Sequence, residues 1–311
     1  MAALAWLLAG TLACGGSGNQ SLEATVDAVN TAVELTLAAM TPAGPDTPSA
    51  TAPSITNTPP GPGSPAPLPT NTSAPPTVVP TSPPPGPTAN ELARPNGAVL
   101  AATQRDTPPN IDAQQDDWPS ELPYAIDQIV FNAPNWAGAA DQSGSFNVMW
   151  DAGNLYLFVV IVDEAHVQND GGETLYRGDS LELQFDAELA GDFNDTALNT
   201  DDYQLGLSAG SSRTNPETYF WNPFARRGQP TGMTLATRPN NDAGGYVAEV
   251  AIPWSLFGLS PAAGNRYGFA LNSSDNDSPG AKEQQSMISS VITRRLLDPT
   301  TWGTLELVIG E

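Results

Sequence analysis

The 311-residue chain contains only one histidine, His166, and only one cysteine, Cys14. One cysteine cannot form an intramolecular disulfide, and a zinc or iron–sulfur site built from several Cys or His ligands is excluded. A Ser-His-Asp triad would have to include His166, which follows Asp163-Glu164-Ala165 and has no evident nucleophile partner. His166 is therefore interpreted as a residue of a loop or of a strand end.

Basic residues are scarce as well. Lys and Arg total 11 against 34 Asp and Glu, which gives a formal net charge of −23. An acidic chain repels phosphate and anionic lipid, so we expect no nucleic-acid binding and no docking of a basic patch on a membrane. Glycoside hydrolysis requires two carboxylates at a fixed separation, and no motif singles out such a pair here. We therefore expect a non-catalytic protein whose ligands are cations or neutral molecules.

The N-terminus predicts export. Residues 2–13 are almost continuously apolar, too short a run to cross ~30 Å of hydrocarbon but suited to a signal peptide, which we place at 1–13. The run ends at Leu12-Ala13-Cys14, which resembles the lipobox of bacterial lipoproteins, although Thr11 and the lack of preceding basic residues depart from that pattern. We expect lipid on Cys14 to be the protein's only membrane contact, at the cell surface or in the periplasm.

Residues 14–106 predict a non-globular stalk. Residues 14–40 include a short stripe of apolar residues at helical spacing, so we expect a lipidated tether with a marginal helix. Residues 41–90 hold 17 of the chain's 31 prolines, one charged residue (Asp46) and no aromatic residue, so they cannot form a core. We interpret 41–106 as a disordered Pro/Thr/Ser-rich linker that displays the folded part away from its anchor.

Residues 107–311 predict one all-β domain. Leu181, Leu183 and Phe185 alternate with Glu182 and Gln184, which is typical of a strand with one buried face. Residues 155–162 are apolar on both faces and predict a central strand. Recurring runs of this kind predict a single antiparallel, jelly-roll-like β-sandwich. The clearest runs are 144–151, 155–162, 180–186, 203–208, 218–221, 231–237, 246–252, 267–272 and 304–309. We expect Trp118, Trp150, Trp254 and Trp302 in the core.

Seven segments of the predicted domain stand out by their sequence and their order. They are NIDAQQDDW (Asn110–Trp118), WDAGNLYLFVVIVDE (Trp150–Glu164), GDSLELQFD (Gly178–Asp186), DDYQLGL (Asp201–Leu207), GYVAEVAIPWSLFGL (Gly245–Leu259), YGFALNSSDND (Tyr267–Asp277) and WGTLEL (Trp302–Leu307). Together, in this order, they resemble the family 9 carbohydrate-binding modules. The resemblance implies a β-sandwich with bound calcium and a non-catalytic domain that binds polysaccharide or oligosaccharide ends in carbohydrate catabolism, in association with glycoside hydrolases.

The resemblance also implies a sugar site in which two Trp rings sandwich a sugar at a chain end. The first ring stands six residues before a Glu, which matches Tyr176 and Glu182. The family's Arg falls near Gly206, and its second Trp falls near Met287, so two expected groups are missing. The predicted carbohydrate-binding residues are Tyr176, Glu182, Gln204, Met287 and Trp221.

A cluster of acids follows the strand that ends at Asp186. Calcium takes six to eight oxygen ligands, so one acidic loop can supply most of a site, and the alternative is a solvated loop. The spacing does not fit an EF-hand, since the twelfth residue from Asp192 is Tyr203. The predicted calcium ligands are Asp186, Asp192, Asn194, Asp201 and Asp202. Asp275-Asn276-Asp277 forms a second, smaller candidate, and Asp163-Glu164 ends a strand that can contribute to a site.

Two alternatives of other classes remain open. One is a surface adhesion or assembly module without sugar specificity. The other is a haem b-binding cytochrome-type β-sandwich, in which Met and His or Met and Lys hold the iron. Its candidate ligands are Met149, Met233, Met287, His166 and Lys282, which occur at no diagnostic spacing.

Overall fold

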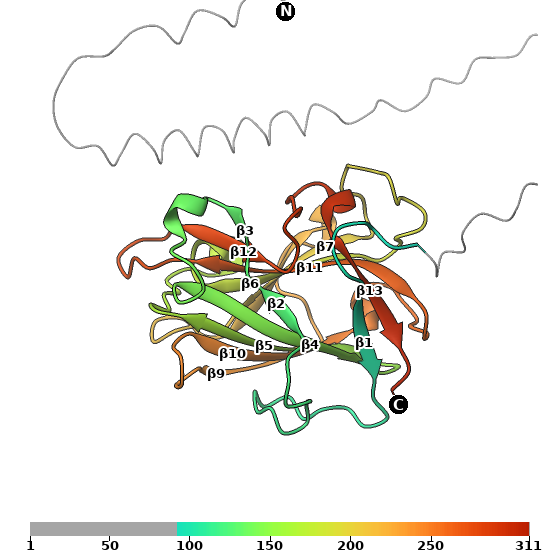
Figure 1. Ribbon diagram of the computed structural model, residues 1–311, viewed down its shortest axis with the longest axis horizontal. Helices are drawn as coiled ribbons and strands as arrows, with labels where there is room; N and C mark the ends of the chain where they lie inside the picture. The colour runs from blue at the N-terminus through green and yellow to red at the C-terminus, as the bar shows by residue number, and fades with distance from the viewer. Residues whose placement is uncertain (1–91, 311) are drawn as a thin grey trace, which may run out of the picture. The chain divides into compact units, whose positions relative to one another are not determined.

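The computed structural model describes residues 92–310 (Figure 1). The predicted signal peptide, Cys14, the marginal helix and the linker up to residue 91 lie outside the described residues. No helix within 92–310 is long and apolar enough to cross a membrane. The strands are β1 (Leu100–Gln104), β2 (Tyr124–Ile126), β3 (Gln128–Phe131), β4 (Gln142–Trp150), β5 (Asn154–Asp163), β6 (Ser180–Asp186), β7 (Asp202–Ser208), β8 (Glu217–Asn222), β9 (Thr234–Pro239), β10 (Tyr246–Pro253), β11 (Arg266–Asp275), β12 (Ser286–Ser289) and β13 (Gly303–Val308). Short 3-10 helices are η2 (Ala133–Asn135), η3 (Gly172–Arg177), η4 (Phe224–Arg226), η5 (Trp254–Leu256) and η6 (Pro299–Thr301).

The strands form one hydrogen-bonded path in the order β8-β7-β6-β11-β13-β1-β4-β5-β10-β9, with β12, β2 and β3 attached beside it. The path folds over on itself, so that β6, β11, β12 and β3 lie in one layer and β4, β5, β10 and β9 in the other (Figure 1). The predicted all-β sandwich is therefore confirmed. It departs from a purely antiparallel arrangement at β1, which runs parallel to both β13 and β4.

Aromatic side chains fill the space between the two layers. Phe146 on β4 stacks on Phe269 of β11 with ring centroids 6.1 Å apart, which joins the two layers. Phe185 on β6 packs on Phe257 at 4.4 Å and on Trp254 at 6.4 Å. Each large apolar side chain buried in this way contributes about 1.5–3 kcal/mol to folding. The core positions predicted for Trp254, Trp150, Trp302 and Trp118 are confirmed, since all four are buried.

The predicted central strand is covered on both faces. Leu157 of β5 faces the main core, and Phe158 packs on its outer side against Trp118, with centroids 5.5 Å apart. The Trp118 indole donates a 2.7 Å hydrogen bond to the buried carboxylate of Glu249 on β10. The same carboxylate accepts hydrogen bonds from the backbone N–H groups of Asp112 and Ala113. It therefore anchors the segment 112–118, which covers the outer side of β5, to the sheet.

Two sequence predictions about burial are wrong. The linker does not extend to residue 106, because residues 100–104 form β1 between β13 and β4, and Arg94 is buried. The polar side of β6 is not solvent-exposed either, because Glu182 and Gln184 are only 4% and 0% exposed. The loop that follows β12 lies over them, since Arg294 bonds both side chains. Both errors arise from partners that are distant in the sequence.

Candidate functional site

Three of the predicted carbohydrate-binding residues share one face of a sheet. In the β6–β7 ladder, Glu182 lies opposite Gly206 and Gln184 lies opposite Gln204. Ser180 of β6 lies opposite Ser274 of β11, which in turn lies opposite Met287 of β12. Directly paired residues project to the same side, so Glu182, Gln204 and Met287 lie on one face. We call this the polar face, defined by Glu182, Gln184, Gln204 and Asn272; the other face of β6 belongs to the core.

The two predicted aromatic residues, Tyr176 and Trp221, contact each other beside the polar face. Tyr176 comes from η3 and packs edge-on against Trp221 of β8, with centroids 6.1 Å apart and planes at 71°. Trp221 is only 8% exposed and donates from Nε1 to the Glu173 carbonyl at 2.7 Å. Tyr219 packs on Trp221 at 5.8 Å. Because these rings touch, no sugar fits between Tyr176 and Trp221, and Tyr176 and Tyr219 form the partly exposed surface of this aromatic group.

The Trp221 ring lies directly over Gly206. A Cβ atom added to Gly206 would stand 2.4 Å from the ring, closer than any real side-chain contact. Position 206 is thus restricted to glycine, because the backbone and the ring approach so closely. The arginine that the family resemblance places here cannot coexist with Trp221 in this position.

Met287 is a poor sugar platform because it is only 2% exposed. Phe131 of β3 lies opposite Met287 in the β12–β3 ladder and is 47% exposed. The accessible apolar surface at this place therefore belongs to Phe131. Sequence reasoning missed Phe131 because β3 is four residues long and joins β12, which lies far along the chain.

Arg294 is the functional candidate that sequence reasoning missed most clearly. Its guanidinium donates from Nη2 to the Glu182 carboxylate and from Nε to the side-chain oxygen Oε1 of Gln184, the latter at 2.7 Å. The amide of Gln184 donates to the Leu296 carbonyl at 3.0 Å. The polar face therefore contains a cation paired with a carboxylate. Only the sequence distance of 112 residues between Arg294 and Glu182 hid this pairing.

The structure brings together three of the predicted calcium ligands. Asp186, Asp192 and Asp202 each offer a carboxylate oxygen within 4.8 Å of the others, and we call them the acid-loop cluster. Oδ1 of Asp192 and Oδ1 of Asp202 are buried without a hydrogen-bond partner, and so is Oδ2 of Asp201. Asn194 is exposed on the same loop. Buried oxygens that lack a donor are what a bound cation would satisfy.

Electrostatics in the acid-loop cluster also favour a cation. Burial raises the pKa of Asp186 to about 6, although the neighbouring Arg94 lowers it. Burial and the neighbouring carboxylates raise the pKa of Asp202 to about 7, and the pKa of Asp192 is raised for the same reasons. Arg94 forms a 2.7 Å ion pair with Asp186 and neutralises one of the three carboxylates. Two negative charges therefore remain when all three are ionised, which matches a divalent ion.

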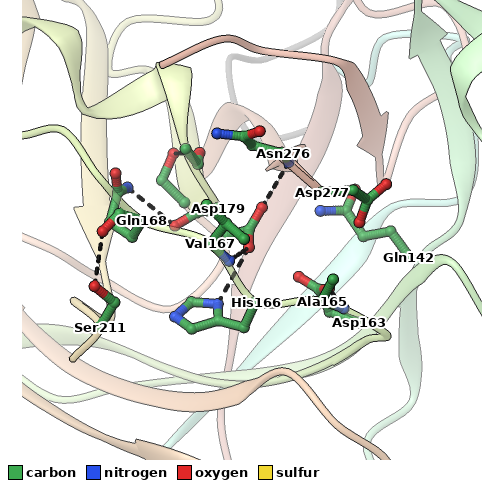
Figure 2. Close-up of polar contacts among 12 residues, drawn as sticks. Gln142, Asp163, Ala165, His166, Val167, Gln168, Asp179, Ser211, Asn276 and Asp277 are labelled. Atoms are coloured by element: carbon green, nitrogen blue, oxygen red, sulfur yellow. Dashed lines mark hydrogen bonds and ion pairs between the residues drawn. The ribbon is translucent and has the colours of Figure 1, made fainter. Parts of the chain in front are cut away.

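A second acidic group lies where β5 and β11 end (Figure 2). Carboxylate oxygens of Asp163, Asp275 and Asp277 lie within 4.8 Å of one another, and each residue has one buried oxygen without a partner. The Oε1 atom of Gln142, opposite Asp163 in the β4–β5 ladder, is also buried and unpartnered. Burial and the neighbouring Asp277 raise the pKa of Asp275 to about 7. We call these four residues the end cluster.

His166 lies beside the end cluster, and Figure 2 shows its contact with Asp179. Its Nε2 lies 2.7 Å from the Gly210 carbonyl oxygen, and its Nδ1 lies 3.4 Å from Oδ2 of Asp179. Asp179 also accepts the backbone N–H groups of Val167 and Asn276. Burial is the largest influence and lowers the pKa of His166, but the interactions with Asp179, the Gly210 carbonyl and Asp163 together outweigh it, so the net shift is upward. His166 thus ties loops together, and ligating a haem iron would break one of these contacts.

A known family model matches the sequence of the β-sandwich. Residues 111–309 match the family model described as carbohydrate family 9 binding domain-like. No curated protein sequence matches the chain. Two structures of a family 9 carbohydrate-binding module from Caldicellulosiruptor kristjanssonii, in complex with cellotriose and with glucose, are similar at 17% and 18% identity, each with a TM-score of 0.49. The alignments cover 69% and 68% of this chain and 95% and 96% of those chains.

The family match covers well over half of the sequence. It includes the segments that carry the aromatic group, the polar face and both acidic clusters. The chain therefore belongs to the family of carbohydrate family 9 binding domain-like proteins.

Proposed function

We propose that the polar face binds a neutral oligosaccharide or polysaccharide without catalysing a reaction. The observation that carries this proposal is the ladder register, which places Glu182 and Gln204 on one face beside the aromatic group of Tyr176. A pyranose presents an apolar C–H face and a rim of hydroxyl groups, so it suits one flat ring with polar groups beside it. Tyr176 would stack on the sugar and the partly exposed Gln204 would bond its hydroxyls, whereas Glu182 is covered by the loop that follows β12.

The affinity should be weak. Tyr176 packs against Trp221 instead of facing it across a gap, so the sugar gains one stacking surface rather than two. We expect dissociation constants of about 1 mM, which corresponds to about −4 kcal/mol. Such a domain would hold a polysaccharide near the cell surface, where glycoside hydrolases act on it.

Titration calorimetry and NMR with cello- and xylo-oligosaccharides, and with their reduced-end forms, test this proposal. Tyr176→Ala should weaken binding at least tenfold, because it removes the stacking surface. Phe224→Ala is the matched control, since this ring is 72% exposed on η4. Loss in Phe224→Ala alone would move the site to the neighbouring η4 surface. Absence of glycan binding by the wild type would favour an adhesion or assembly module instead.

We also propose that the acid-loop cluster holds a structural calcium ion. The support is the chemistry of the donors: the cluster is all oxygen, as calcium prefers, and it contains buried oxygens without partners. Asp186, Asp192 and Asp202 would hold the ion, with Asp201 beside them. The end cluster has the same character and would hold a second ion.

We further propose that the protein is exported and anchored through lipid on Cys14. The apolar run before Cys14 and the proline-rich segment after it support a displayed domain. Cys14→Ser should release the protein from the membrane fraction of a bacterial host. Unchanged fractionation of this variant would contradict the anchor, and the wild type treated in parallel is the control.

A further inference from the structure

His166 and two buried carboxylates meet where β5 ends and β6 begins (Figure 2). Asp163 is the last residue of β5, Asp179 directly precedes β6, and His166 lies in the segment between them. One possible ligand atom from each of the three lies within 4.8 Å of the other two. Asp163 and Asp179 are only 1% and 0% exposed. We call these three residues the histidine cluster.

The hydrogen bond of His166 determines which ring nitrogen can bind an ion. Nε2 lies 2.7 Å from the Gly210 carbonyl oxygen, which can only accept, so Nε2 carries a hydrogen and donates it. In the neutral imidazole, the lone pair is then on Nδ1. A histidine that binds a metal almost always has this arrangement, because the donated hydrogen bond fixes the tautomer and the ring orientation. The Tyr246 ring also packs against the imidazole, with centroids 4.9 Å apart.

The Nδ1 atom of His166 faces an acceptor and not a donor. It lies 3.4 Å from Oδ2 of Asp179, which already accepts the backbone N–H of Val167. Nδ1 is buried, and it finds no hydrogen-bond partner among residues 92–310. In a tetrahedral zinc site, Zn–N and Zn–O bonds of about 2.0–2.2 Å place neighbouring ligand atoms roughly 3.4 Å apart. The separation of Nδ1 and Oδ2 therefore suits one ion bound to both.

Asp163 completes a set of three ligands. Its Oδ1 atom accepts the backbone N–H of Ala165 at 2.7 Å, whereas its Oδ2 atom is buried without a partner among the described residues. Burial and the neighbouring Asp179 carboxylate raise the pKa of Asp163, because two carboxylate charges repel each other away from water. A divalent cation would satisfy the unpaired oxygen and offset both charges.

The donor atoms of the histidine cluster differ from those of the two all-oxygen clusters. Calcium takes oxygen ligands, whereas an imidazole nitrogen suits zinc and related transition metals. One histidine is enough here, because two carboxylates supply the other ligands. Three protein ligands leave the fourth tetrahedral position for water. The His166 side chain is 21% exposed, so solvent reaches the cluster from the side of the imidazole.

We propose that Asp163, His166 and Asp179 bind a divalent transition-metal ion such as zinc, with Nδ1 of His166 as the nitrogen ligand. The ion would join the end of β5 to the start of β6 and stabilise the segment between them. This site is independent of the proposed carbohydrate binding. Asp163 also belongs to the end cluster, so the test needs one variant that alters only each group.

Zinc titration of the full-length protein, made without a histidine tag, tests this inference. All samples carry Cys14→Ser, so that the single thiol cannot take the ion. Loss of a supporting partner of a metal ligand costs about 10–100-fold in affinity, so His166→Gln, which removes a ligand, should weaken the tightest zinc site by about tenfold or more in calorimetry. Asp277→Asn alters the end cluster alone and is the matched control, with zinc affinity expected to stay within about twofold.

NMR gives a readout that a purely structural role of His166 would not produce. His166 is the only histidine, so its imidazole resonances are assigned without ambiguity. In isotope-labelled protein with His166 intact, zinc should shift the Nδ1 resonance strongly and the Nε2 resonance much less, and calcium should not reproduce this pattern. A Nδ1 resonance that zinc leaves unchanged overturns the inference even if a variant fails to fold. Equal zinc affinity of His166→Gln and its parent also overturns it, and the calcium and carbohydrate proposals stand in both cases.

Discussion

Arg94 and Asp186 form an ion pair of 2.7 Å with side chains only 1% and 0% exposed, although 92 residues separate them in the sequence. The backbone N–H of Arg94 also donates to Oγ1 of Thr304 at 2.9 Å. The guanidinium passes over Gly268, where a Cβ atom would stand 2.5 Å from Nη1. The segment before β1, which contains Arg94, is thus part of the sandwich and contacts the acid-loop cluster.

A fragment of residues 107–311 should be much less stable than one of residues 92–311. The shorter fragment lacks β1 and leaves Asp186 without Arg94, and breaking a buried ion pair costs about 3–5 kcal/mol. Urea unfolding of both fragments measures the difference. Arg94→Ala in the longer fragment should reproduce part of the loss. Equal unfolding midpoints would show that the segment before residue 107 is dispensable.

Calcium should raise the free energy of unfolding through the acid-loop cluster. An ion that binds only the folded state adds about 2.7 kcal/mol at 100 times its dissociation constant. Melting curves in calcium and in chelator measure this, with Asp192→Asn and Asp202→Asn expected to reduce the response. Asp195→Asn, an exposed change in the same loop, is the control. An undiminished response in the two cluster variants would assign the stabilisation to the end cluster.

In chelator, the protein should be more stable at pH 5 than at pH 8. Burial raises the pKa values of Asp202 and Asp275 from 3.8 to about 7, and that of Asp186 to about 6. The folded state therefore holds more protons than the unfolded chain between about pH 4 and pH 7, and stability falls as pH rises through this window. Saturating calcium should shrink the difference, because the ion favours ionised carboxylates. A melting temperature that rises from pH 5 to pH 8 in chelator would refute this.

Glu249→Ala should destabilise the domain by about 1.5–3 kcal/mol, the range for hydrogen bonds to a charged group. The substitution removes the acceptor of the Trp118 indole and of two backbone N–H groups, and it frees the segment that covers Phe158. Thermal unfolding followed by Trp fluorescence measures the effect. Asp116→Ala changes an exposed acid of the same segment and serves as the control. Similar stability of the two variants would mean that Glu249 does not anchor this segment.

Local patterns in the sequence determined the fold class and much of the architecture. The alternation of apolar residues in 180–186 and the doubly apolar run in 155–162 depend only on near neighbours, and β6 and β5 occur where these patterns predict strands. The segment order also indicated the family that the later comparison established. Three of the calcium ligands predicted in and beside the acidic loop after β6, Asp186, Asp192 and Asp202, lie close together in the structure.

Only the tertiary structure decided which of these residues meet. Arg294 reaches Glu182 across 112 residues, Arg94 reaches Asp186 across 92, and Phe131 lies beside Met287 through a four-residue strand. Period-2 alternation shows which face a side chain takes but not what covers that face. The alternation alone assigned Glu182 to a solvent-exposed face, but the loop after β12 covers that face. Arg294 on this loop compensates Glu182 for the loss of water, and no local pattern in the sequence reveals this partner.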